Sequence, residues 1–120
     1  MYKITKDFHF AASHQLANLP DGHKCKRLHG HNFIVQIELS SRKLNEFGFV
    51  VDFGQLYPVK NYIDEVLDHH HLNDIIGDNA TAENLAKHLF NFCYGIWPES
   101  ITAVCVSETP KTWAMYDGGA

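Results

Sequence analysis

Nine consecutive residues, from His23 to His31, gather three imidazoles and one thiol, which are side chains that could do chemistry. They read His-Lys-Cys-Lys-Arg-Leu-His-Gly-His, and a further histidine, His14, lies a short way upstream. Imidazole is the commonest side-chain ligand for metals, and a thiolate is a strong nucleophile near neutral pH. The stretch is therefore a candidate for a structural zinc site, for a catalytic metal site with a thiol beside it, or for neither.

The three histidines His14, His29 and His31 converge if the strands that carry them pair. Along residues 2–14, aromatic and other apolar residues alternate with polar ones, a pattern typical of a half-buried strand that ends at His14. Residues 29–39 alternate in the same way. Side chains two apart in a strand share a face, so His29 and His31 point together. Three histidines with an open fourth position are the ligand set of catalytic zinc, although spacing alone leaves open that these are ordinary histidines near a turn.

The candidate thiol is Cys25, which lies in the predicted loop 17–28 among Lys24, Lys26 and Arg27. Positive charge of this kind favours the thiolate form of a cysteine. The alternative is a bystander cysteine beside solvated loop charges. The other two cysteines, at positions 93 and 105, occupy apolar positions and are predicted to be core residues.

Two acidic positions stand out further along the chain. Asp68 directly precedes His69, and a histidine oriented by a carboxylate commonly activates a cysteine. Glu108 ends an apolar strand, where a charge needs a partner or a ligand. For Asp68 and His69, the alternative is a solvated polar loop, which suits His71 well. For Glu108, the alternative is a strand that simply reaches solvent.

The elements that must position these residues follow from periodicity. Helical spacing of apolar residues predicts a helix that starts near Leu56, with Asp52 or a neighbour as its cap and Pro58 in its first turn. A second helix begins at about Thr81, a plausible cap, and carries the apolar stripe Leu85, Leu89, Phe92 and Cys93.

Two further strands follow, at residues 101–107, buried on both faces, and at residues 112–116. We expect residues 40–47 to form a connection and residues 48–53 a short extended piece. The order strand, strand, helix, helix, strand, strand predicts one α+β domain over residues 1–120, with two helices on one face of a four-stranded antiparallel sheet.

Composition narrows the class of protein. A net charge of -4 argues against a nucleic-acid-binding domain, and the sequence has no apolar run long enough to span a membrane. Its N-terminus lacks the apolar core of a signal peptide, and three widely spaced cysteines do not form a disulfide framework. We therefore expect a cytoplasmic protein.

Several motifs together resemble the 6-pyruvoyltetrahydropterin synthase family. They are His14 and the runs 22–31 (Gly-His-Lys-Cys-Lys-Arg-Leu-His-Gly-His), 67–74 (Leu-Asp-His-His-His-Leu-Asn-Asp), 81–85 (Thr-Ala-Glu-Asn-Leu) and 106–109 (Val-Ser-Glu-Thr). The resemblance covers essentially the whole chain in the same order, and within the family it is strongest to the bacterial 6-carboxytetrahydropterin synthase branch of the queuosine pathway. The chain departs from that pattern at Ala80, where many relatives have proline, and in a slightly short connection at residues 40–47.

The resemblance implies a role for each candidate residue. One zinc ion per subunit is bound by His14, His29 and His31. Cys25 is the general base, with Asp68 and His69 as its relay partners, and we prefer His69 to His70 because it directly follows the aspartate. Glu108 holds the amino-pyrimidine edge of a pterin, and Thr81 and Glu83 are further substrate-binding candidates. Lys24, Lys26 and Arg27 could meet a triphosphate.

The resemblance also implies an assembly and a reaction. Subunits of this tunnelling-fold type join their sheets into a barrel, as a trimer or a dimer of trimers, with active sites between subunits. The implied reaction converts 7,8-dihydroneopterin triphosphate to 6-carboxy-5,6,7,8-tetrahydropterin with release of acetaldehyde and triphosphate. The alternatives are a 6-pyruvoyltetrahydropterin synthase, a non-catalytic pterin- or metal-binding module, and a zinc hydrolase, although the His-Glu-x-x-His motif of such hydrolases is missing.

Overall fold

Two long strands, β1 (Tyr2–His14) and β2 (His29–Ser41), form the framework of the fold. They pair antiparallel along their whole length, with Tyr2 opposite Ser41 and His14 opposite His29. This computed structural model describes residues 1–119. β3 (Ile101–Thr109) pairs with β2, and β4 (Thr112–Tyr116) pairs with β3, so the sheet has the order β1-β2-β3-β4. The predicted pairing of the first two strands is confirmed.

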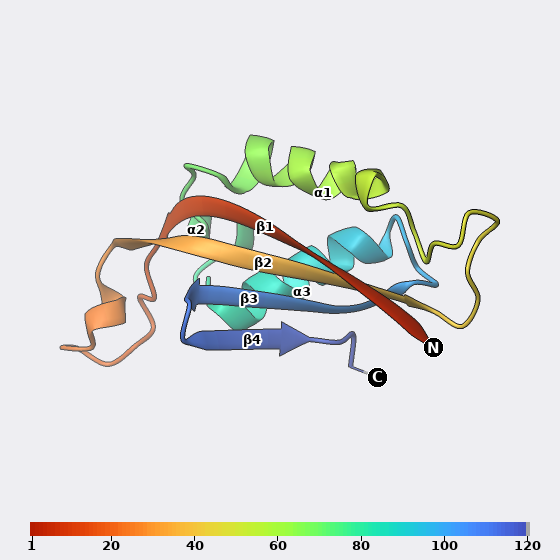
Figure 1. Cartoon of the computed structure of the whole chain (residues 1–120). Helices are drawn as coiled ribbons and strands as arrows, with labels where there is room; N and C mark the ends of the chain where they lie inside the picture. The colour runs from red at the N-terminus through yellow and green to blue at the C-terminus, as the bar shows by residue number, and fades with distance from the viewer. Residues whose placement is uncertain (120) are drawn as a thin grey trace.

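The helices lie together on one face of this sheet (Figure 1). α1 (Tyr57–Tyr62) follows a 3-10 turn at Phe53–Leu56 and continues into a π-helical turn at Ile63–Leu67. The Asp52 carboxylate accepts a hydrogen bond from the Gly54 N–H and so caps the first turn, as predicted. A short helix, α2 (Asn73–Ile76), precedes α3 (Ala82–Tyr94). The predicted α+β architecture is therefore confirmed.

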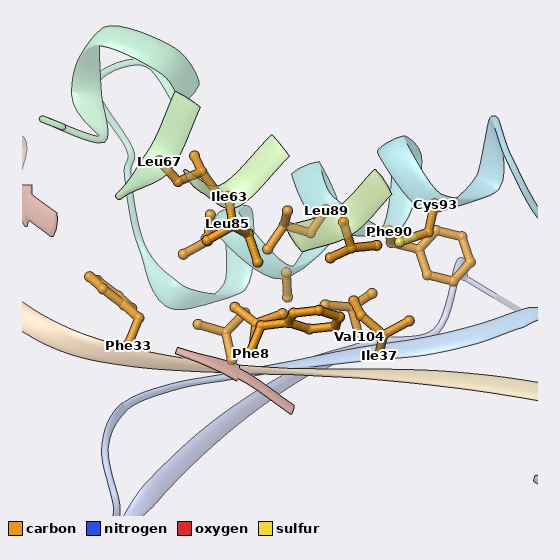
Figure 2. Close-up of a cluster of buried hydrophobic side chains, with 14 of the residues drawn as sticks. Phe8, Phe33, Ile37, Ile63, Leu67, Leu85, Leu89, Phe90, Cys93 and Val104 are labelled. Carbon is orange, nitrogen blue, oxygen red and sulfur yellow. The ribbon is translucent and has the colours of Figure 1, made fainter. Parts of the chain in front are cut away.

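The core lies between the sheet and the helices (Figure 2). Alternate side chains of the strands point toward the helices because the side-chain period of a strand is two. Those labelled in Figure 2 come from three strands and from the helical segments above them: Phe8, Phe33, Ile37 and Val104 below, and Ile63, Leu67, Leu85, Leu89, Phe90 and Cys93 above. This packing joins the sheet, in which β1 and β2 carry the candidate ligands, to the layer of helices.

The structure corrects several details of the sequence-based prediction. Residues 48–52 contain bends rather than an extended strand, and β2 continues to Ser41. On α3, Phe90 is buried in the core, whereas Phe92 is only half-buried. β3 extends to Thr109 and is buried on both faces through most of its length, as predicted. Within residues 1–119, no helix is long and apolar enough to cross a membrane.

Candidate metal centre and substrate pocket

The three histidines predicted as ligands lie together at one end of the β1–β2 hairpin. His14 and His29 are directly opposite each other in the strand register, and His31 follows on the same face. One ring nitrogen from each lies within 4.8 Å of the others. His14 is fully buried, with a relative exposure of 0%. Antiparallel pairing with a side-chain period of two therefore brings the three side chains together on one face of the hairpin.

Backbone carbonyls orient two of these rings. Nδ1 of His14 donates to the carbonyl of Ala80 over 2.7 Å, and Nδ1 of His29 donates to the carbonyl of Arg27 over 2.6 Å. A carbonyl can only accept, so both protons are on Nδ1 and the lone pair of each Nε2 is free. This arrangement is common in metal-binding histidines, because a fixed tautomer presents one nitrogen to the metal.

The Nε2 atoms of all three histidines are buried and have no hydrogen-bond partner among the described residues. Leaving a buried polar atom unpaired costs about 1–3 kcal/mol, so a folded protein rarely tolerates three such atoms in one place. A zinc ion would satisfy all three and would keep a fourth position for a water molecule or a substrate. The donor set therefore fits a catalytic zinc ion.

The alanine at position 80 does not disturb this arrangement. Ala80 is buried just before α3, and it contacts His14 through its main-chain carbonyl. A main-chain contact is available whether the residue is alanine or proline. This departure from the family pattern leaves the support of the candidate ligand unchanged.

Glu108 lies beside the histidine cluster. Its Oε2 is 3.6 Å from Nε2 of His31, which is too long for a direct hydrogen bond. Burial lowers the pKa of His31, the charge of Glu108 acts in the opposite direction, and the two neighbouring histidines lower it further. The net lowering favours the neutral imidazole, which is the form that binds a metal.

The side chains of Asp68 and His69 lie within hydrogen-bond distance of each other. Oδ2 of Asp68 lies 3.0 Å from Nδ1 of His69, and Oδ1 accepts a hydrogen bond of 3.0 Å from the backbone N–H of Ala11. The bond from Ala11 and then the bond to His69 hold the pKa of Asp68 below its ordinary value. Nδ1 of His70 is instead bonded to the main-chain carbonyl of Asp68. Geometry therefore pairs the carboxylate with His69.

A hollow of about 420 Å³ is lined by His69 of this pair and by His31 of the histidine cluster. Its lining comes from β1, from β2 and from the segment after the π-helical turn: Ala11, Ala12, Ser13, Gly30, His31, Asn32, His69 and His70. A volume of this size is typical of a small-molecule site. His31 and His69 thus both line one hollow, although they are far apart in the sequence.

The same subunit does not bring Cys25 into this hollow. Cys25 lies on a single 3-10 turn in the loop between β1 and β2, where its N–H donates to Nδ1 of His23 and its carbonyl accepts from the N–H of Leu16. Among the described residues, the lining of the hollow does not include it. The thiol is half-buried beside the N-terminal end of β2, but the geometry of one chain does not connect it to His69.

The basic residues around Cys25 differ in their surroundings. Lys26 forms an ion pair with Asp21, whereas the side chains of Lys24 and Arg27 are exposed to solvent. Lys26 is therefore partly neutralised by its own loop. Lys24 and Arg27 are the two better placed to meet an anionic ligand.

A second, smaller hollow of about 210 Å³ brings together two of the predicted substrate-binding acids. Glu83, from the first turn of α3, and Glu108, from β3, both line it, and Trp113 of β4 forms another wall. Thr81 is used differently. Its hydroxyl accepts a 3.2 Å hydrogen bond from the N–H of Asn84 and caps α3, and its part in substrate binding stays a prediction.

Some residues that support the site are not predicted by the sequence analysis. The imidazole of His71 is hydrogen-bonded to the hydroxyl of Ser13 over 2.9 Å, so it is not the solvated histidine that we expected. The side chain of Asn73 makes two hydrogen bonds with the backbone of Gln15, of 2.9 and 2.7 Å. These contacts join positions 58 residues apart, and a local pattern carries no signal for them.

Comparison with known proteins agrees with this geometry. The family model described as 6-pyruvoyl tetrahydropterin synthase matches residues 3–119. The chain is 36% identical to the 6-carboxy-5,6,7,8-tetrahydropterin synthase of Synechocystis sp., over 97% of this chain and 93% of that protein. It is 33% identical to the protein of the same name from Rickettsia bellii, over 92% of this chain and 96% of that one.

A solved structure shares the fold along nearly the whole chain. The 6-pyruvoyl tetrahydropterin synthase of Caenorhabditis elegans superimposes with a TM-score of 0.85 at 25% identity, covering 98% of this chain and 96% of that one. Together with the family match, this similarity extends over both hollows and the histidine cluster. The chain therefore belongs to the 6-pyruvoyl tetrahydropterin synthase family, a family of enzymes with a lyase-type reaction.

Proposed function

We propose that this protein is a zinc-dependent lyase that converts 7,8-dihydroneopterin triphosphate to 6-carboxy-5,6,7,8-tetrahydropterin, releasing acetaldehyde and triphosphate. The observation that carries the proposal is the trio of buried, unpartnered Nε2 atoms of His14, His29 and His31. The hollow beside them is lined by both His31 and His69. The names of the relatives from Synechocystis and Rickettsia bellii support the carboxy product. We place the reaction in the queuosine pathway of the cytoplasm.

In this proposal His14, His29 and His31 hold one zinc ion per subunit. When bound, zinc would act as a Lewis acid toward the hydroxyl oxygens of the substrate side chain, which makes the neighbouring C–H more acidic. The buried position of His14 and the carbonyls behind His14 and His29 keep the ligands in place, so little reorganisation is needed.

Cys25 is the proposed general base, and it accepts the proton of that C–H as a thiolate. The Asp68–His69 pair sets the protonation state of the base in this proposal, with the Asp68 carboxylate orienting the imidazole through its 3.0 Å contact with Nδ1. Triphosphate leaves from the end of the side chain. Water then takes part in cleavage of the carbon–carbon bond between the side-chain carbon attached to the ring and the two outer carbons. The outer carbons leave as acetaldehyde, and the carbon that stays on the pterin becomes the carboxylate.

The pterin ring is proposed to bind near Glu108. A carboxylate can accept two parallel N–H bonds from an amino-pyrimidine edge, which is a strong and directional contact. The position of Glu108, between the histidine cluster and the hollow shared with Glu83, supports this role. Lys24 and Arg27 are proposed to meet the triphosphate, since their charges are exposed on the loop that carries Cys25.

We further propose that the active site forms between subunits of a trimer or a dimer of trimers. The sheet has two outer strands, β1 and β4, through which sheets of neighbouring subunits could join into a barrel. Such an assembly would let the loop that carries Cys25 reach the Asp68–His69 pair of another copy. The separation of Cys25 from the hollow within one chain supports this arrangement.

The direct test is incubation of the zinc-loaded protein with 7,8-dihydroneopterin triphosphate, followed by identification of the products by mass spectrometry. Carboxy-tetrahydropterin with an equal amount of acetaldehyde is the expected result. Pyruvoyl-tetrahydropterin without acetaldehyde would assign the alternative synthase activity, and binding of the pterin without turnover would assign a binding role. Near-wild-type release of triphosphate by a zinc-loaded Cys25→Ala variant would show that the thiol is not the base.

A further inference from the structure

The segment from Asp68 to Asn73, here called the edge segment, lies along the end of β1 like a short additional strand. Ser13 and His71 form a parallel bridge between the two. The N–H of Ser13 donates to the carbonyl of His70 over 3.2 Å, and the N–H of Leu72 donates back to the carbonyl of Ser13 over 2.8 Å. Ser13 is therefore the residue of β1 at which the edge segment is attached.

A side-chain bond reinforces this attachment. The hydroxyl of Ser13 and Nδ1 of His71 share a hydrogen bond of 2.9 Å, and both residues are half-buried. Ser13 directly precedes the candidate ligand His14, and His71 lies two residues after His69. The bond therefore joins the strand that carries a metal ligand to the segment that carries the acid–base pair.

His69 depends on such external support. Its side chain is 82% exposed, so packing does not hold it. Its backbone has a φ of 59°, in the left-handed region that is strained for a non-glycine residue. Its N–H donates to the carbonyl of Ala11 over 2.6 Å. A strained and exposed residue keeps one geometry only where neighbouring contacts impose it.

We propose that Ser13 and His71 are positioning residues, which hold the Asp68–His69 pair in its place at the rim of the hollow. Neither side chain is assigned a contact with the substrate. Loss of their bond would loosen the edge segment from β1 and spread His69 over several orientations. The catalytic part of this inference rests on the proposed function, because it assumes that the pair acts on Cys25.

The first experiment measures amide hydrogen exchange in the zinc-loaded protein and does not depend on activity. His71→Ala should speed exchange at the N–H groups of His69 and Leu72 by about fivefold, the factor that corresponds to one net hydrogen bond. Ser13→Ala should have the same effect, and the double variant should add little to either, because both single changes remove the same bond. His71→Asn, whose amide can replace Nδ1, should restore slow exchange.

The matched control is Ser40→Ala, since Ser40 also makes a cross-strand side-chain bond, to Thr102, far from the site. It should leave exchange at His69 and Leu72 unchanged. Exchange in His71→Ala that equals wild type would overturn the proposal, as would fully additive effects of the Ser13 and His71 changes.

The second experiment measures turnover of 7,8-dihydroneopterin triphosphate. His71→Ala should lower kcat by about tenfold with little change in KM and with zinc retained, because orientation of a proton-transfer group acts on the chemical step. His71→Asn should recover most of the loss. Faster exchange without any fall in kcat would mean that the contact is only structural, and would overturn the positioning role. If the wild-type protein does not turn over this substrate, the proposed function fails, whereas the exchange result still decides whether Ser13 and His71 hold the pair.

Discussion

At the scale of single residues, the hydrogen bond made by one ring nitrogen of a candidate ligand decides which nitrogen is left to bind a metal. His14 and His29 both use Nδ1 on a main-chain carbonyl, which leaves Nε2 as the only nitrogen free to bind a metal. These carbonyls belong to the backbone, so they persist when the side chains of Ala80 or Arg27 are exchanged. The orientation of these two candidate ligands therefore does not depend on the side chains at positions 80 and 27.

Removal of one ligand should release the metal. We expect His29→Ala to reduce bound zinc from about one ion per chain to a small fraction, because two remaining histidines do not form a closed coordination set. Metal content after gel filtration, measured by mass spectrometry, checks this. His9→Ala, which removes an exposed imidazole from the same hairpin, should keep a full complement of zinc. Full zinc content in His29→Ala would refute the ligand assignment.

The lowered pKa of Asp68 predicts a dependence of stability on pH. Since the bond from Ala11 and the pair with His69 favour the carboxylate in the folded state, Asp68 stabilises the protein fully above its ordinary pKa of 3.8. That contribution is lost as the pH falls from there through the lower folded-state pKa. In metal-free protein, the free energy of unfolding in urea should therefore drop more steeply below about pH 4 in wild type than in Asp68→Asn. The same dependence of the free energy of unfolding on pH in wild type and in Asp68→Asn would contradict this prediction.

At the scale of elements, the site depends on how α3 begins. The carbonyl of Ala80 that orients His14 comes just before the cap Thr81 and the first turn of the helix. The helix start is in turn held by packing of Leu85 and Leu89 against the sheet. The metal centre and the helix therefore share one structural support.

Loss of the cap should have a measurable cost. Thr81→Ala removes the hydroxyl that accepts from Asn84, and we expect the free energy of unfolding to fall by about 1 kcal/mol, whereas Thr81→Ser should be nearly neutral. Urea unfolding measures both. A rise in KM in Thr81→Ala that Thr81→Ser reverses would add a direct role in substrate binding. Unchanged stability in Thr81→Ala would exclude the capping role.

The elements also show what a sequence can predict here. A side-chain period of two predicts β1, β2 and the convergence of the three histidines, because face and spacing are local properties. The short helix α2 and the π-helical turn are too brief to leave a periodic signal. The carbonyl of Ala80 and the Ser13–His71 bond are contacts between distant segments, and only the fold brings them together.

At the scale of the whole molecule, the position of Cys25 away from the hollow leads to a complementation experiment. If Cys25 and His69 of one site come from different subunits, mixed oligomers of Cys25→Ala and His69→Ala chains contain some sites with both residues intact. Random assembly of equal amounts should recover about one quarter of wild-type activity, while each variant alone stays inactive. Joint refolding of the two variants, followed by the product assay, measures this.

The control for that experiment is to mix the two variants after each has assembled separately, which should recover nothing if subunits do not exchange. Activity that stays at the level of the single variants after joint refolding would place both residues in one chain. Light scattering of the same samples should give a mass of three or six times the 13.7 kDa of one chain.

The placement of all three histidines on one hairpin has a consequence for the order of folding. His14 and His29 are only 15 positions apart and meet across adjacent strands, so closing the loop between them costs little chain entropy. The bond from Ser13 to His71 spans 58 residues and needs the helical segment to be in place first. During refolding we therefore expect the three histidines to converge as the hairpin forms, whereas the Ala80 carbonyl behind His14 and the Ser13–His71 bond join once the helical segments are in place.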